Sequence, residues 1–367
     1  MSKVTGMKLS RFDLYRYSLP FSRPLEFEGT TLYRREGLLL RLAGDDGSEG
    51  WGETAPLPGF SGESSVDAAS QLRRLAASMM EREIEDKWVD PYGEPGSRLD
   101  RTAPSVRFGF ELAVWNLYGT LSGRTLPELV KPSPRDEVAV NGLLSGSAVE
   151  VLEGARRMRE EGYPSVKLKV GTRAVAEDTA LVRALGEELG PNISLRLDAN
   201  RAWSYEEAAE FVRGAAGVRL EYIEEPLADP TRLPGFSREF GVPVALDESL
   251  VGLEPEALEE HRYARAFVLK PTLLGGISRT LWTAERALRL GVTPVVSSAY
   301  ESGVGTAALV ALAAGIGEHP VPAGLDTYRA MAEDVLETPL NLPAPSVGVR
   351  ETADASHTIA VRRLERL

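Results

Sequence analysis

Cysteine is absent from the 367 residues, and long apolar runs are missing as well. Without cysteine the chain can form no disulfide, no thiolate metal site and no cysteine nucleophile. The most apolar stretch, Ala307 to Gly317, is far shorter than a membrane span. The N-terminal segment lacks the uninterrupted apolar core of a secretory signal. These absences predict a cytoplasmic enzyme with no membrane partner.

Lysine is scarce, and basic charge is outweighed by acidic charge. Only seven of the 42 cationic residues are lysine, and the formal net charge is −12. Such a charge argues against a nucleic-acid partner, which requires a basic surface. Arginine keeps its proton in proteins, whereas a buried lysine can lose it and act as a base. A lysine inside an apolar strand therefore indicates that its chemistry is needed there.

The sequence pattern changes along the chain in a way that predicts two domains. A strand, a hairpin and an amphipathic helix are expected within residues 8–79, followed by a Gly- and Pro-rich linker over Asp90–Pro104. We predict an α+β capping domain over residues 1–103, with the segment 331–367 packing back on it.

From about Glu137 short β-rich runs alternate with helical segments. Eight such runs predict a parallel (β/α)₈-type barrel over residues 104–330. An open doubly wound sheet is the alternative, but no Gly-x-Gly-x-x-Gly motif follows the first run, and eight units favour closure. The runs are VAVNGLL, SVKLKV, ISLRLDA, LEYIEEP, PVALDES, AFVLKPT, TPVVSSA and a weaker AGLD.

Polar residues stand at the C-terminal ends of these apolar runs, spaced by about one β/α unit. In a barrel such positions surround a single mouth, where active sites of this fold lie. The residues are Lys167, Lys169, Asp198 (with Asn200), Glu224, Asp247, Lys270 and Ser297, and Gly324 follows one further unit along the chain.

The three acids of this set predict a metal site. Asp198, Glu224 and Asp247 lie on neighbouring strands and would repel one another without a cation between them. Ligation by oxygen alone selects a hard ion, Mg²⁺ or its substitute Mn²⁺. Such an ion stabilises the negative charge that develops when a substrate carboxylate becomes an enediolate. The expected partner is a small-molecule carboxylate.

The lysines complete this chemistry. Lys167 and Lys169 are two residues apart on a strand and share one face, here the barrel interior. Two ammonium groups close together near a divalent cation lower each other's pKa, so one can act as a general base near pH 7. Lys270 lies beyond the acidic strands and faces the other side of a bound substrate.

Ordinary structural explanations exist for each residue taken singly. Asp198 or Asp247 alone could cap a helix, and two alternating lysines could belong to an exposed edge strand. Coincidence is the weaker explanation, because three of the seven lysines bracket three acids in register. A Schiff-base lyase would use a lysine without needing the acids, and a non-catalytic metal- or sugar-binding barrel would not need the lysines.

A family resemblance is carried by eight phrases of the sequence. They are GWGETAPLPGFSGE (Gly50–Glu63), APSVRFG (Ala103–Gly109), LRLDANRAW (Leu195–Trp203), EEPL (Glu224–Leu227), DESL (Asp247–Leu250), LKPTLLGG (Leu269–Gly276), SSAYESGVG (Ser297–Gly305) and GLDT (Gly324–Thr327). In this order they resemble the enolase superfamily, in the branch with a Lys-x-Lys motif and a second lysine across the barrel. Within it, PLPGFS and LRLDANRAW resemble the o-succinylbenzoate synthase family most.

The resemblance implies a role for each residue of the set. It makes Asp198, Glu224 and Asp247 the Mg²⁺ ligands and Lys169 the base that removes the α-proton in a syn dehydration. Lys167 would tune that base, and Lys270 would stabilise the enediolate. The residues implied for substrate binding or its support are Ser297, Gly324, Arg196 and Asn200, with capping loops near Phe21–Arg23 and Leu57–Ser61 closing over the substrate.

The resemblance leaves one alternative open on the same scaffold. An N-succinylamino acid racemase or a dipeptide epimerase would use Lys169 and Lys270 as bases on opposite faces of the substrate. The oligomeric state is not determined by the sequence, and a monomer is compatible with it.

Overall fold

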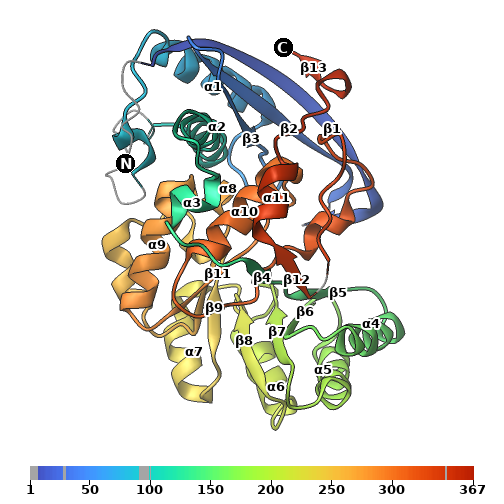
Figure 1. The fold of residues 1–367 in the computed structure, drawn as a ribbon. Helices are drawn as coiled ribbons and strands as arrows, with labels where there is room; N and C mark the ends of the chain where they lie inside the picture. Colours follow the sequence, from blue (N-terminus) through green and yellow to red (C-terminus); the bar gives the residue numbers. More distant parts are fainter. Residues whose placement is uncertain (1–6, 28–29, 91–98, 100, 344) are drawn as a thin grey trace.

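The computed structural model describes residues 7–27, 30–90, 99, 101–343 and 345–367. Figure 1 shows an antiparallel sheet at the top of the view and the strands of a barrel below it. Most of the predicted linker, Asp90–Pro104, lies outside the described residues. The predicted architecture of a (β/α)₈-type barrel with an α+β N-terminal part is confirmed.

The N-terminal part is built on an antiparallel sheet of order β13-β1-β2-β3. Its strands are β1 (Leu9–Phe27), β2 (Thr30–Gly44), β3 (Glu49–Thr54) and β13 (Glu365–Arg366). The last strand brings the C-terminus against β1, where Arg366 pairs with Tyr15 in register. The division into domains at residue 103 stays a prediction.

Two helices that follow β3 in the chain pack against this sheet. They are α1 (Ser65–Met79), which begins with a capping box of Ser64 and Asp67, and α2 (Pro104–Ser122). Helix α2 is buried on nearly all sides, because it lies between β3 and the barrel. Its approach to β3 requires glycine: a Cβ on Gly52 would stand 1.9 Å from the Gly109 carbonyl oxygen.

Seven parallel strands form most of the barrel, in the order β11-β10-β9-β8-β7-β6-β5. They are β5 (Gly142–Leu144), β6 (Ser165–Lys169), β7 (Ser194–Asp198), β8 (Leu220–Glu224), β9 (Val244–Leu246), β10 (Ala266–Leu269) and β11 (Thr293–Val296). Their apolar residues are buried on both faces, as expected for a parallel sheet covered by helices.

The two ends of the predicted series differ from expectation. The eighth run is not a strand, but parallel bridges join Val140 to Ala323 and Ser297 to Gly324, so this segment closes the ring. The first run is broken into two short strands. Its first half, β4 (Glu137–Ala139), pairs antiparallel with β12 (Ser346–Gly348) rather than with β6.

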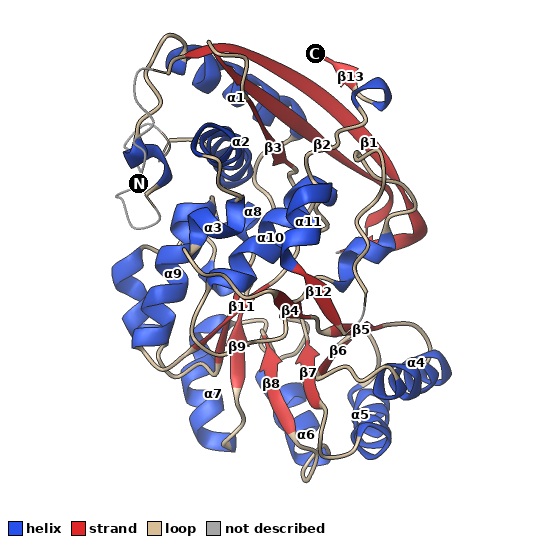
Figure 2. Ribbon diagram, viewed as in Figure 1, coloured by secondary structure: helices blue, strands red, loops and turns tan. Residues whose placement is uncertain are grey.

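The other helices lie outside the barrel strands or between those strands and the N-terminal sheet (Figure 2). They are α3 (Leu126–Val130), α4 (Ala148–Glu160), α5 (Val175–Leu189), α6 (Tyr205–Gly214), α7 (Leu233–Phe240), α8 (Pro271–Leu274), α9 (Ile277–Arg289), α10 (Gly303–Gly315) and α11 (Val349–Ala355). Between β9 and β10 the connection contains the 3₁₀ helices η3 (Glu248–Leu250) and η4 (Pro255–His261).

The most apolar stretch of the sequence forms α10. This helix is buried along nearly its whole length, between the barrel and the N-terminal part of the chain. Among the described helices, none has both the length and the apolar character needed to cross a membrane.

Candidate active site at the barrel mouth

The parallel register brings the predicted polar residues to one end of the barrel. Lys169 pairs with Asp198, and Asp198 pairs with Glu224 across β6, β7 and β8. Asp247 and Lys270 are the first residues after β9 and β10. Each side chain is positioned because an apolar strand ends at that residue and the chain turns outward.

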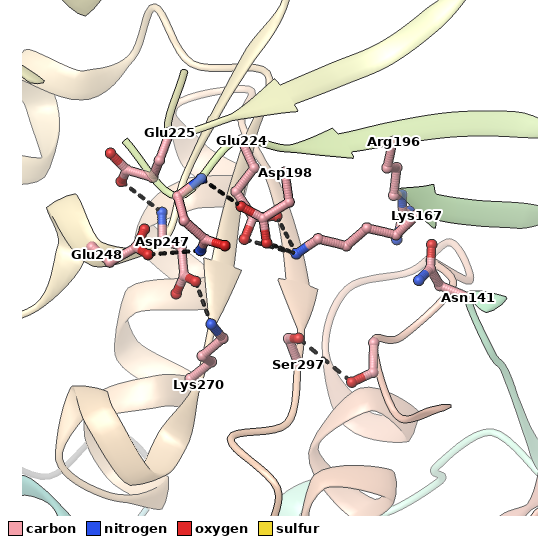
Figure 3. A network of polar contacts seen from close by, with 12 residues as sticks. Asn141, Lys167, Arg196, Asp198, Glu224, Glu225, Asp247, Glu248, Lys270 and Ser297 are labelled. Atoms are coloured by element: carbon pink, nitrogen blue, oxygen red, sulfur yellow. Dashed lines mark hydrogen bonds and ion pairs between the residues drawn. The ribbon is translucent and has the colours of Figure 1, made fainter. Parts of the chain in front are cut away.

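Lys167 lies between two of the acids (Figure 3). Its Nζ is 2.8 Å from Asp198 Oδ2 and donates to both carboxylate oxygens of Glu224 at 2.9 and 2.8 Å. The Glu224 side chain is fully buried, and that of Lys167 is 15% exposed. The first lysine of the Lys-x-Lys motif is therefore the one bound to the acids in this structure.

Lys169, the second lysine of the motif, is half-buried at the end of β6. In the part of the chain that the structure describes, its ammonium has no hydrogen bond or ion pair. The two lysines of the motif thus differ in their surroundings, and the second is the one available to another molecule.

Lys270 and Asp247 form a direct ion pair across the neighbouring strand ends (Figure 3). The Asp247 backbone is held by Glu225, whose carboxylate accepts from the Asp247 N–H at 3.0 Å and from the Ser249 N–H at 2.8 Å. Glu225 is fully buried and also binds Arg201. The second acid of the Glu-Glu-Pro motif therefore orients the loop that carries Asp247.

Asn200 and Glu248 complete the acidic side of the mouth. The Asn200 N–H donates to Asp198 Oδ1 at 3.1 Å, and its side-chain amide donates to Glu248 Oε1 at 3.0 Å. Sequence reasoning missed Glu248. Its position next to Asp247 in the Asp-Glu-Ser motif was the available signal, but adjacent residues often point in opposite directions.

Ser297 and Gly324 lie together where the ring closes. Ser297 Oγ is 3.5 Å from the Gly324 carbonyl oxygen, and a Cβ on Gly324 would stand 2.5 Å from that hydroxyl. Glycine is therefore required for this approach. Arg196 is 1% exposed, and its guanidinium donates to Glu221 and to the Pro322 carbonyl. Its contacts are thus with the closing segment and with the strand beside it.

Charge is crowded at the mouth. Burial raises the pKa of Glu224 well above its usual value, and the charge of Asp198 raises it further, although Lys167 opposes both. Burial and the charge of Asp247 raise the pKa of Glu248 to about 7. Burial alone would lower the pKa of Lys167, but the charges of Asp198 and Glu224 outweigh it and raise that pKa.

This donor set suits a hard divalent cation. All candidate ligands are carboxylates, and the buried Glu248 Oε2 has no hydrogen-bond partner within the described residues. The same residues do not include three acidic or histidine side chains already gathered around one point. Instead, lysine ammonium groups stand beside the acids and balance part of their charge.

Two family descriptions match the chain. Residues 150–353 match "Enolase C-terminal domain-like", and residues 9–117 match "MenC, N-terminal domain". The first match contains the three acids and the three lysines of the barrel mouth, and it covers more than half of the chain.

Two curated relatives match over most of this chain. An o-succinylbenzoate synthase of Pasteurella multocida is 32% identical over 89% of this chain and 92% of that protein. The chloroplastic protein PHYLLO of Arabidopsis thaliana is 32% identical over 98% of this chain, which spans only 23% of PHYLLO.

Solved structures share the fold. A muconate lactonizing enzyme from Pseudomonas fluorescens, complexed with muconolactone, is 25% identical with a TM-score of 0.83, covering 93% of this chain and 94% of that one. A dipeptide epimerase from Enterococcus faecalis, complexed with Mg and the dipeptide L-Leu-L-Tyr, is 20% identical with a TM-score of 0.83, covering 93% and 97%. The latter likeness is one of fold alone. By its family matches and its relatives, the chain belongs to the enolase superfamily and, within it, to the o-succinylbenzoate synthase family.

Proposed function

We propose that the chain is an o-succinylbenzoate synthase. It converts 2-succinyl-6-hydroxy-2,4-cyclohexadiene-1-carboxylate to 2-succinylbenzoate and water by syn dehydration, a step of menaquinone biosynthesis. The observation that carries the proposal is the set of three acids bracketed by lysines at one barrel mouth, in a chain whose relatives have this name.

Lys169 is the proposed base. It removes the proton from the carbon beside the carboxylate, and the C–H electrons pass into the carboxylate to form an enediolate. The protonated Lys169 then gives its proton to the departing hydroxyl, so that one water is lost and the ring becomes aromatic. The half-buried ammonium of Lys169, beside Asp198 in register, supports this role.

Lys167 and Lys270 carry positive charge on the two sides of the acids. Lys167 stands against Asp198 and Glu224 and is proposed to tune Lys169 and to meet the substrate carboxylate. Lys270, beside Asp247, is proposed to stabilise the enediolate as a cation from the opposite face. Phe60 lies 5.7 Å from the Lys270 Nζ, measured to its ring centre, so the loop Leu57–Ser61 adjoins this lysine.

Asp198, Glu224 and Asp247 are the proposed ligands of Mg²⁺, with Mn²⁺ as a substitute. The bound cation supplies charge that stabilises the enediolate. The surplus of buried negative charge around Glu224 supports the assignment. Ser297 and Gly324 are proposed to hold the succinyl carboxylate, whereas Asn200 and Arg196 support the site through Asp198 and the closing segment. A cytoplasmic location belongs to the same proposal.

The decisive experiment measures turnover of the cyclohexadiene substrate by wild type and by Lys169→Ala. Wild type is expected to lose activity with a chelator and regain it with Mg²⁺. Because general base catalysis contributes roughly 10² to 10⁴-fold, the variant should lose about that factor in kcat. Lys131→Ala is the matched control, since Lys131 contacts Gly317 and Glu318 beyond the end of α10. Substantial activity in Lys169→Ala would overturn its assignment as the base.

A racemase or epimerase is the second candidate, favoured only by the placement of Lys169 and Lys270 on different sides of the acids. That enzyme would use both lysines as bases. Proton exchange on an N-succinylamino acid in deuterated water separates the two functions. If Lys270→Arg abolished proton exchange in one stereochemical direction only, the result would favour the racemase.

A further inference from the structure

A buried arginine of the N-terminal sheet binds the turn that follows β11. Arg35 lies on β2 and is 1% exposed. Its guanidinium donates hydrogen bonds at 2.5 to 3.3 Å to five backbone carbonyls, three of the N-terminal part and two of the turn. These carbonyls belong to Glu36, Ala55, Pro56, Ala299 and Tyr300.

Contacts of this kind fix backbone positions. A buried guanidinium has five N–H groups in a rigid fork, and each one left without an acceptor is costly. Carbonyl oxygens cannot rotate away as side chains can. If the segment at Ala55–Pro56 or the turn at Ala299–Tyr300 shifted, N–H groups of the buried Arg35 would therefore lose their acceptors.

The turn itself has an unusual backbone. Tyr300 has a φ of 63°, in the left-handed region that non-glycine residues seldom occupy. Its N–H donates to Ser298 Oγ, and its carbonyl accepts from Arg35, each at 2.9 Å. Ser298 is in turn held by the fully buried carboxylate of Glu301. Such strain persists where the surroundings determine it, and it is common at functional sites.

The Tyr300 side chain stands near the barrel mouth. Its ring meets that of Phe21 edge-on at 5.9 Å, and it follows Ser297 by three residues. Burial raises the pKa of its hydroxyl, although the positive charges of Lys270 and Lys167 oppose the rise. Tyr300 thus joins the turn that follows Ser297 to the capping segment at Phe21.

Two of the carbonyls of the N-terminal part that bind Arg35 also belong to a segment near the barrel mouth. Ala55 and Pro56 precede Leu57, which packs with Leu273 and Ala299 in a small buried cluster that Phe60 adjoins. Arg35 thus fixes two segments that approach the mouth from different parts of the chain.

We propose that Tyr300 is a further substrate-contacting residue and that Arg35 is a positioning residue acting through it. This inference rests on the proposed function. Arg35 keeps the Tyr300 turn at a fixed distance from the N-terminal sheet, and thereby keeps the aromatic ring at the wall of the substrate pocket.

The test is a double-mutant cycle on kcat/KM with Tyr300→Ala, Arg35→Met and the double variant. Because a displacement of about 1 Å at a site can cost roughly 10²-fold, each single variant should lose about ten- to a hundredfold, mainly through a higher KM. The double variant should be no worse than the poorer single variant. Arg34→Met is the matched control, since Arg34 is exposed and its contacts are with Ser18.

The outcomes separate the inference from a merely structural role. Rates are normalised to folded protein by circular dichroism, and Arg35→Lys replaces Arg35→Met if the latter does not fold. Two results would overturn the inference, provided that the wild type is active. One is a loss of kcat/KM in the double variant equal to the product of the two single losses, and the other is a Tyr300→Ala enzyme with the KM of wild type. A wild type that fails to turn over the substrate would instead defeat the proposed function.

Discussion

Two of the buried polar clusters among the described residues hold charge in different ways. At the barrel mouth, the Lys167 ammonium stands between Asp198 and Glu224, so that side-chain charge faces side-chain charge. At the junction of the N-terminal sheet with α10, Glu53 accepts from the backbone and hydroxyl of Ser302 and from the Gly305 N–H. The Tyr17 hydroxyl also donates to this carboxylate, so the Glu53 charge is bound by neutral donors, namely hydroxyls and the N–H groups at the start of α10.

This difference suits different tasks. Side chains at the mouth can exchange their ionic partners for a cation or a substrate, because no backbone has to move. The acceptors around Arg35 belong to the backbone, and Glu53 is bound by two backbone N–H groups as well as by the hydroxyls of Tyr17 and Ser302, so these groups cannot change partners without moving the turn. The mouth therefore suits the proposed chemistry, and the junction suits a rigid structural role.

The largest effect is expected from neutralising an acid of the mouth. Glu224→Gln should lower kcat by roughly 10³-fold, because a proposed cation ligand is lost. Stability should change little, since the buried Glu224 carboxylate is repelled by Asp198 as well as attracted by Lys167. Steady-state kinetics at saturating Mg²⁺ and thermal unfolding measure the two effects. A Glu224→Gln variant that stays active but unfolds at a much lower temperature would contradict the difference between the mouth and the junction.

The opposite result is expected at the junction. Glu53→Ala leaves the donors of Ser302 and Gly305 without their acceptor, so the free energy of unfolding should fall by roughly 4 kcal/mol. Denaturant titration measures this loss. Glu49→Ala on the same strand is the control: its exposed carboxylate pairs with Arg41, and such pairs contribute at most about 1 kcal/mol. Equal losses in both variants would contradict the special role of Glu53.

Glu111 is a buried carboxylate intermediate between the two clusters, because backbone donors bind it but are few. It lies on α2 and accepts from the Ser278 N–H at the start of α9, at 3.0 Å. Burial raises its pKa to about 7 from a usual 4.5, although Ser278, Ile277 and Arg107 oppose the rise. Its few donors therefore do not fully replace the water that the carboxylate loses.

The pH dependence follows from the direction of that shift. Between pH 4.5 and 7 the folded protein binds the Glu111 proton more tightly than the unfolded chain does, so stability falls as pH rises through this range. The loss is at most about 3 kcal/mol. Glu111→Gln should flatten this part of the profile of unfolding free energy against pH, and the exposed Glu160→Gln should not. A profile unchanged by Glu111→Gln would show that other groups cause it.

Much of the architecture was predictable because it depends on the local pattern of apolar and polar residues. Alternating apolar runs and helices predict the barrel, and polar residues at the run ends predict the mouth. The weak eighth run was the exception. Ala323 and Gly324 make isolated bridges only, and Arg196 donates to the Pro322 carbonyl beside them.

The partners of individual side chains were not predictable. The sequence marks Lys167 and Lys169 as equivalent in face, yet only the reach of the first to Asp198 and Glu224 distinguishes them. Glu225 stands directly after Glu224 in the sequence, and nothing there indicates that its carboxylate holds the loop of Asp247. Such contacts join residues far apart in the chain, and they depend on register and rotamer.

The sequence alone therefore determined the fold class and the residue types of the mouth, because these follow from periodicity and from which side chains stand at strand ends. It indicated the family through the resemblance of its motifs. The tertiary structure alone decided which lysine pairs with the acids and how Arg35 and Glu53 fix the turn after β11. A strand pattern places a residue at the mouth, but only packing determines which charge it meets there.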